Sequence, residues 1–175
     1  SLAPSLLLRN EGTSFTDVTA TSLAGVAPKL VSSAAAADYD GDGLLDVFVA
    51  CYKPAGVLGP DSWHRVRNGG PSLLFRNKGD GTFEEVGAQA GVAQPHFSFA
   101  AAWGDHDGDG KPDLAVANDY GDKTLYHNLG GGKFEEVAAA AGVSDTGNGM
   151  GVDWGDADGD GRLDLAITNH DVHTV

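Results

Sequence analysis

The sequence predicts an all-β chain built from propeller-type blades, and three observations support this fold class. An acidic loop with the pattern Asp-x-Asp-Gly-Asp-Gly-x-x-Asp occurs at residues 38–46, 105–113 and 156–164. A second motif, which reads as strand, Asn/Gly turn and strand, alternates with this loop three times. The repeat is about 51 residues long with about four short strands per unit, which is typical of a propeller blade.

The first elements of the repeat are the two strands of a hairpin. The hairpin motif spans residues 7–18, 74–86 and 125–137, and each copy places an Asn before a turn that contains Gly. Asn and Gly favour tight turns, so each copy predicts two antiparallel strands. Each hairpin Asn precedes the first Asp of the next acidic loop by 28 residues, as Asn10 precedes Asp38. This fixed spacing indicates that hairpin and loop belong to one repeating unit.

A short apolar run follows each acidic loop. The runs cover residues 47–50, 114–117 and 165–168 and are rich in β-branched or small apolar residues. Continuous apolar runs of this length, bounded by turn residues, predict buried strands. Each acidic loop therefore leads directly into a predicted buried strand.

The phase of the repeat predicts half-blades at both ends of a single domain of 175 residues. The expected parts are a trailing half-blade at 1–20, a blade at 21–90 with an insertion at about 52–72, a blade at 91–142 and a leading half-blade at 143–175. These parts amount to about three blade equivalents, fewer than the four to eight that close a propeller. Three explanations stay open: a segment of a longer propeller, ends that pair between molecules in a closed oligomer or filament, or an open arc.

The acidic loops predict metal binding. Like charges at about 4 Å repel by roughly 4 kcal/mol per pair at an effective dielectric constant near 20, and a bound hard cation would offset this repulsion. Calcium suits all-oxygen ligation in a flexible loop, and positions 1, 3 and 5 match the start of an EF-hand loop. These loops differ from an EF-hand loop, however, because their last carboxylate stands at position 9 and a strand follows it. A bare Asp/Gly-rich turn without metal is the alternative.

We expect about three Ca²⁺ ions as cofactors. In each loop the predicted ligands are the four Asp side chains and the carbonyl of the seventh residue. They are Asp38, Asp40, Asp42, Leu44 and Asp46; Asp105, Asp107, Asp109, Lys111 and Asp113; and Asp156, Asp158, Asp160, Arg162 and Asp164. The side chains of Lys111 and Arg162 are expected to point outward.

Composition excludes several classes of function. The net charge is −14, and twelve of the 25 acidic residues are in the three loops. A nucleic-acid partner needs basic patches, so this balance argues against nucleic acid and also disfavours an anionic membrane surface. No run approaches 18 apolar residues, which predicts that nothing inserts into a membrane. The single cysteine, Cys51, allows no internal disulfide.

The two alternating motifs together resemble the FG-GAP/VCBS-type repeat. The likeness extends to the ASPIC/UnbV (cartilage acidic protein-like) family of calcium-binding β-propellers, and integrin α-subunit propellers carry a similar loop. The resemblance implies seven-bladed propellers, calcium in the blade loops, and a secreted or cell-surface location. It further implies an extracellular module for cell adhesion or for protein or glycan recognition, in which Ca²⁺ stabilises the blades.

No motif for catalysis is present, and the chain is expected not to be an enzyme. Glu84–Glu85 and Glu135–Glu136 are neighbours on a strand and point to opposite faces, so neither pair predicts a catalytic dyad. The alternative function is a structural protein that self-associates through its terminal half-blades. A fragment of a polysaccharide-active enzyme is less favoured.

The insertion at about 52–72 is the candidate contact for a protein or glycan ligand. It carries aromatic and basic residues on an otherwise acidic chain: Trp63, His64, Arg65 and Arg67. Exposed side chains of these types are common at recognition sites, although Trp63 would equally pack the insertion onto its own blade.

Two further groups of residues stand out. Trp103 and Trp154, two residues before the second and third loops, are expected to pack between blades. His106 and His127 receive no function, and the pair His170 and His173 suggests at most a weak transition-metal site.

Overall fold

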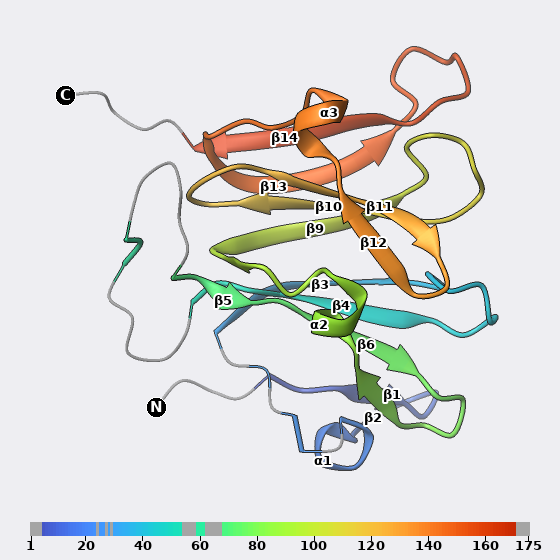
Figure 1. Cartoon of the computed structure of the whole chain (residues 1–175). Coiled ribbons are helices and arrows are strands. Elements are labelled where there is room, and N and C mark those ends of the chain that lie inside the picture. Colours follow the sequence, from blue (N-terminus) through green and yellow to red (C-terminus); the bar gives the residue numbers. More distant parts are fainter. Residues whose placement is uncertain are drawn as a thin grey trace.

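The computed structural model describes residues 5–23, 25–26, 28, 30–53, 59–61 and 68–170, and this part of the chain is built mainly from β-strands. The all-β prediction is confirmed. Figure 1 shows the sheets stacked face to face, from the N-terminal hairpin at one end to the C-terminal hairpin at the other. The described residues form an open stack and do not close into a propeller ring.

Two four-stranded antiparallel sheets form the centre of the stack. The first full sheet has the order β3 (Val31–Ala37), β4 (Asp46–Cys51), β6 (Leu73–Asn77), β7 (Phe83–Glu85). The second full sheet has the order β9 (Ser98–Gly104), β10 (Asp113–Asn118), β11 (Thr124–Gly130), β12 (Lys133–Glu136). In both sheets an acidic loop joins the first two strands, and a hairpin turn joins the last two.

Two-stranded sheets lie at the ends of the stack. The N-terminal hairpin pairs β1 (Leu8–Asn10) with β2 (Phe15–Asp17), and the C-terminal hairpin pairs β13 (Asn148–Gly155) with β14 (Asp164–His170). A minor ladder joins β5 (Gly70–Pro71) to β8 (Pro95–His96). The N-terminal hairpin corresponds to the last two strands of a full sheet, and the C-terminal hairpin corresponds to the first two.

Short helical turns follow the hairpins, and the sequence analysis did not predict them. They are α1 (Thr19–Ser22), α2 (Gly87–Ala90) and α3 (Ala138–Ala141). After α2, Gly91 adopts a left-handed conformation with φ of 93°, and the Val92 amide donates to the Gly87 carbonyl at 2.9 Å. This pattern is the Schellman ending, which favours Gly because it has no Cβ.

Apolar side chains fill three layers between the sheets. Strand β4 alternates between two of them: Phe48 and Ala50 pack toward the second full sheet, whereas Val49 and Cys51 pack toward the N-terminal hairpin. Side chains of a strand point alternately to its two faces, so a strand between two covered faces requires a continuous apolar run. This confirms the predicted buried strands for β4 and β10.

The third predicted buried strand is only partly buried. In β14 the side chains of Leu165 and Ile167 are half-buried, and the other residues are exposed. Leu165 packs toward the second full sheet, but no further sheet of the described residues covers the opposite face. The apolar run thus predicts the strand correctly and overestimates its burial.

The two tryptophans lie between neighbouring sheets, as expected. Trp103 on β9 donates its indole N–H to the Ala35 carbonyl of β3 at 3.1 Å. Trp154 on β13 makes the corresponding bond to the Ala102 carbonyl of β9 at 3.2 Å. A Cβ at Gly104 would approach the Trp154 ring to 2.6 Å, which explains the glycine at this position.

A buried lysine also joins the second full sheet to the C-terminal hairpin. Lys123 is 1% exposed, and its ammonium group donates to the carbonyls of Asp145, at 3.2 Å, and Gly147. Burial lowers the pKa of Lys123.

Of the described helices, none is long and apolar enough to span a bilayer.

Candidate functional site

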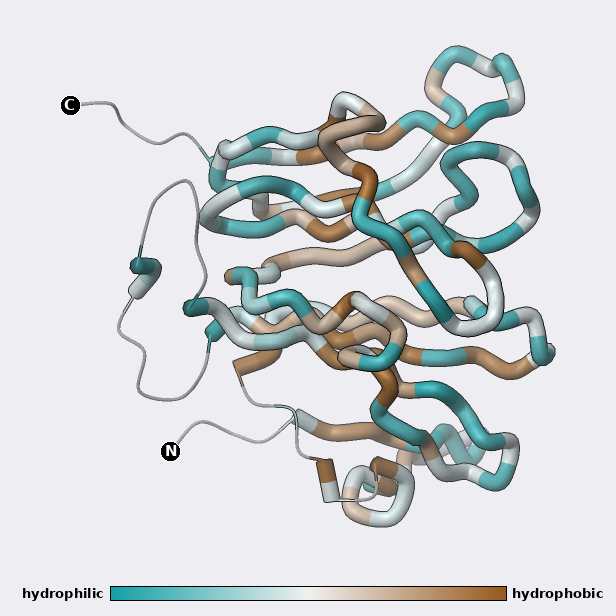
Figure 2. Tube along the Cα trace, viewed as in Figure 1, coloured by the Kyte–Doolittle hydropathy of each residue, from teal (hydrophilic) through white to brown (hydrophobic). Residues whose placement is uncertain are grey.

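The three acidic loops lie on the same edge of the stack. Each joins the first two strands of its sheet, so stacking the sheets in register brings the loops into a row (Figure 1). Figure 2 shows this edge as largely hydrophilic, in contrast to the apolar strands behind it. The row forms an acidic rim on one side of the molecule.

Each loop wraps around the carboxylate of its first Asp. In the first loop, Asp38 accepts hydrogen bonds from the amides of Gly41, Asp42 and Gly43 at 2.9–3.1 Å. The corresponding bonds to Asp105 and Asp156 recur in the other two loops. This curl requires a left-handed backbone at both glycines, with φ of 77° at Gly41 and 87° at Gly43.

The curled loops bring carboxylates together. In each loop, carboxylate oxygens from three Asp residues lie within 4.8 Å of one another. These groups are Asp38, Asp40 and Asp42; Asp105, Asp107 and Asp109; and Asp156, Asp158 and Asp164. Clusters of oxygen donors at this separation are suited to a hard cation such as Ca²⁺.

The first loop contains a buried oxygen without a hydrogen-bond partner. Oδ1 of Asp40 is inaccessible to solvent and receives no hydrogen bond from the described residues. A buried carboxylate oxygen that lacks a partner carries a substantial free-energy cost. Asp40 belongs to the group with Asp38 and Asp42, so a cation among these three residues would satisfy this oxygen.

The ninth Asp of the loop ties it to the neighbouring hairpin. Asp46 and Asp113 are both fully buried. Oδ2 of Asp46 accepts the Tyr39 amide at 3.3 Å, and Oδ1 accepts the Asn77 amide at 2.7 Å. Burial raises the pKa of Asp46 to about 6, against the opposite effect of these hydrogen bonds. Each carboxylate oxygen of Asp46 keeps a second lone pair for a ligand.

The side chains of Lys111 and Arg162 are exposed to solvent, as expected, but each pairs with a carboxylate of its own loop. The Lys111 ammonium pairs with Oδ2 of Asp109, and the Arg162 guanidinium pairs with Oδ2 of Asp160. Both cations are two residues from a carboxylate in a strongly negative loop, which attracts them. The first loop has Leu44 at this position, so no cation of its own competes for Asp42. The carbonyls of Leu44, Lys111 and Arg162 stay predicted ligands.

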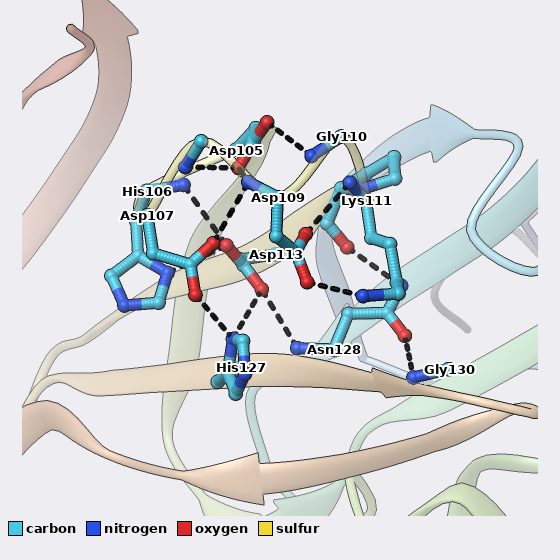
Figure 3. A network of polar contacts seen from close by, with 12 residues as sticks. Asp105, His106, Asp107, Asp109, Gly110, Lys111, Asp113, His127, Asn128 and Gly130 are labelled. Atoms are coloured by element: carbon cyan, nitrogen blue, oxygen red, sulfur yellow. Dashed lines mark hydrogen bonds and ion pairs between the residues drawn. The ribbon is translucent and has the colours of Figure 1, made fainter.

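The second loop has a feature that the sequence analysis missed. His106, from the loop, and His127, from β11, both face Asp113 (Figure 3). Nδ1 of His106 lies 2.6 Å from Oδ2 of Asp113, and Nδ1 of His127 lies 3.2 Å from Oδ1. The two residues are far apart in the sequence, and the pairing of β10 with β11 brings them together.

The insertion is described only near its ends. Trp63, His64, Arg65 and Arg67 lie outside the described residues, as does His173. At the start of the insertion, the Tyr52 hydroxyl donates to the buried carboxylate of Asp119. Ligand binding by the insertion stays a prediction.

Comparisons with known proteins agree with this architecture. The profile of the FG-GAP-like repeat family matches residues 4–49, 65–116 and 105–167. Human cartilage acidic protein 1 is 39% identical over 74 residues, which cover 40% of this chain and 11% of that protein. The mouse protein of the same name is 38% identical over 74 residues, 12% of its length. The three matched segments include all three acidic loops and most of the chain, which therefore belongs to the FG-GAP-like repeat family.

Proposed function

We propose that the chain is a calcium-stabilised propeller segment that serves as an extracellular recognition or adhesion module. The observation that carries the calcium assignment is the unpartnered oxygen of Asp40 within the group of Asp38 and Asp42. The ions would hold the loops in their curled form and offset the repulsion among their carboxylates. The extracellular setting rests on family membership and on the similarity to cartilage acidic protein 1.

The metal has a structural role in this proposal. A site filled at ten times its Kd adds roughly 1.4 kcal/mol to the free energy of unfolding, so three independent sites would add about 4 kcal/mol. That amount is a large share of the 5–15 kcal/mol, approximately, that stabilises a typical domain. The proposal assigns no reaction to the chain, and the insertion with Trp63 is its candidate contact for a protein or glycan.

Replacing Asp40 with Asn is expected to abolish calcium binding at the first loop. Calorimetric titration of the chelated protein should show about one Ca²⁺ fewer than for the wild type. At a calcium concentration ten times Kd, calcium should stabilise the variant by roughly 1.4 kcal/mol less than it stabilises the wild type. The free energy of unfolding in chelator should change little. Asp80→Asn removes the same charge from a hairpin turn outside the carboxylate groups, and it should bind as many ions as the wild type. Equal stoichiometry for Asp40→Asn and the wild type would contradict the assignment.

A second candidate function is self-association through the terminal hairpins. In each full sheet the hairpin Asn donates its amide to the ninth Asp of the loop at 2.7 Å, as Asn77 does to Asp46. The counterparts of these two residues, Asn10 and Asp164, lie at opposite ends of the stack. If β14 of one molecule paired with β1 of another, the pair would complete a four-stranded sheet. The register of β4 with β6 would then place Leu165 opposite Leu8.

This candidate function predicts that the average molar mass measured by light scattering rises with protein concentration. Asp164→Lys places a positive charge at the proposed junction and should keep the protein monomeric in light scattering. Asp153→Lys makes the same charge change at an exposed position on β13 and should assemble as the wild type does. A wild type that stays monomeric at all concentrations, or an Asp164→Lys variant that still assembles, would reject self-association.

A further inference from the structure

We propose that the second loop and the strand facing it form a site for a zinc-class transition-metal ion, which would replace Ca²⁺ there because the two ions share Asp107 and Asp113. The site consists of His106, Asp107, Asp113 and His127, each of which offers a ligand atom within 4.8 Å of the others. Two of the four donors are imidazole nitrogens, whereas the proposed calcium groups contain only oxygen. The four residues come from two parts of the fold, the acidic loop and β11 (Figure 3).

The distances would fit a small four-coordinate ion after small shifts of the side chains. Zn²⁺ binds His nitrogen and carboxylate oxygen at about 2.0–2.2 Å, so ligand atoms of a tetrahedral site lie about 3.4 Å apart. Nδ1 of His127 lies 3.2 Å from Oδ1 of Asp113 and 3.7 Å from Oδ2 of Asp107. Nδ1 of His106 lies 2.6 Å from Oδ2 of Asp113. These separations involve both oxygens of Asp113, and each lies within about 1 Å of the tetrahedral value.

The carboxylate at the centre of this group is held rigidly. Asp113 is fully buried and accepts the His106 amide at 2.9 Å and the Asn128 amide at 2.7 Å. Such outer hydrogen bonds fix the orientation of a metal-binding carboxylate. The rings of His106 and His127 meet edge to face at 5.3 Å, and both side chains are about four-fifths buried. The metal would bind close to pre-positioned donors.

The donor set selects the class of metal. Ca²⁺ takes oxygen ligands, whereas imidazole suits zinc, copper and nickel. The other repeats lack this donor set because the first has Tyr39 and Arg76 at the two histidine positions, and the third loop has Ala157. The second repeat is thus chemically distinct from its neighbours on the same rim.

The repeats also supply the matched variants. His106→Ala installs the residue of the third loop, and His127→Arg installs the residue of the first two hairpins. Zn²⁺ titration calorimetry of the calcium-free protein should show one high-affinity ion bound to the wild type. Each variant should bind that ion more weakly by at least about tenfold. Asp80→Asn, in a hairpin turn outside the candidate metal groups, should leave the affinity unchanged.

Cobalt provides a test that needs no variant. Co²⁺ in a four-coordinate site absorbs visible light far more strongly than the octahedral aquo ion does. The wild type should therefore acquire an intense visible spectrum with Co²⁺, and Zn²⁺ should displace it. An octahedral spectrum, or zinc affinity unchanged in both His106→Ala and His127→Arg, would overturn the proposal.

Discussion

Replacing Asp113 with Ala is expected to lower the free energy of unfolding by about 3 kcal/mol or more, even in the absence of metal. The Asp113 carboxylate is fully buried and accepts backbone amides from His106 and Asn128. Each buried donor left without a partner costs about 1–3 kcal/mol. The substitution also disconnects the acidic loop from the hairpin of the same sheet. Denaturant unfolding in chelator measures the loss without any contribution from ion binding.

The C-terminal hairpin provides the matched control. Asp164 occupies the same position in the third loop and accepts the Ala157 amide at 2.9 Å, but it is exposed. Asp164→Ala should change the free energy of unfolding by less than about 1 kcal/mol in dilute, monomeric protein, since water replaces the lost acceptor. If both variants lose the same stability, the ninth Asp does not act as an anchor between loop and hairpin.

The repeat pattern predicted most of the strands because it reflects two structural constraints, the bond between hairpin and loop and the burial of the strands. The hairpin Asn and the ninth Asp both recur, and in the two full sheets they bond to each other, as Asn77 does to Asp46, across separations of 31 and 15 residues. The apolar runs of β4 and β10 reflect burial on both faces. Sequence alone could not show that β14 is partly exposed, because its residues resemble those of β4 and only the neighbouring sheet decides its burial.

The features that the sequence did not predict depend on contacts between distant segments or on competing charges. His106 and His127 meet because β11 pairs with β10, and no local spacing encodes this contact. The sequence analysis assigned no position to Lys123, whose ammonium group donates to the carbonyls of Asp145 and Gly147 in the interior. Lys111 pairs with Asp109, two residues away in the negative loop, while its side chain stays 43% exposed.

Replacing Trp103 with Ala is expected to lower the free energy of unfolding by about 3–5 kcal/mol, the usual cost of deleting a large aromatic side chain from a core. Trp103 joins the two full sheets. Its ring stacks on Tyr39 at 6.2 Å and meets Phe48 edge to face at 6.5 Å, and its indole N–H bonds to Ala35 of β3. The substitution removes all three contacts across the interface. Denaturant unfolding, with hydrogen exchange to locate the loosened strands, would measure the effect.

Two variants separate the hydrogen bond from the packing. Trp103→Phe keeps an aromatic ring but leaves the Ala35 carbonyl without its donor, and it should cost about 1–2 kcal/mol. Trp154→Ala removes the equivalent indole bond at the C-terminal hairpin. Because only one sheet of the described residues packs against that hairpin, its faster hydrogen exchange should be confined to β13 and β14 while the two full sheets stay protected. A loss for Trp103→Ala no larger than that for Trp154→Ala would mean that the sheets associate through their apolar strands and that the tryptophan contributes little. The predicted order assigns a large share of the central interface to Trp103, whose indole N–H bonds β9 to β3.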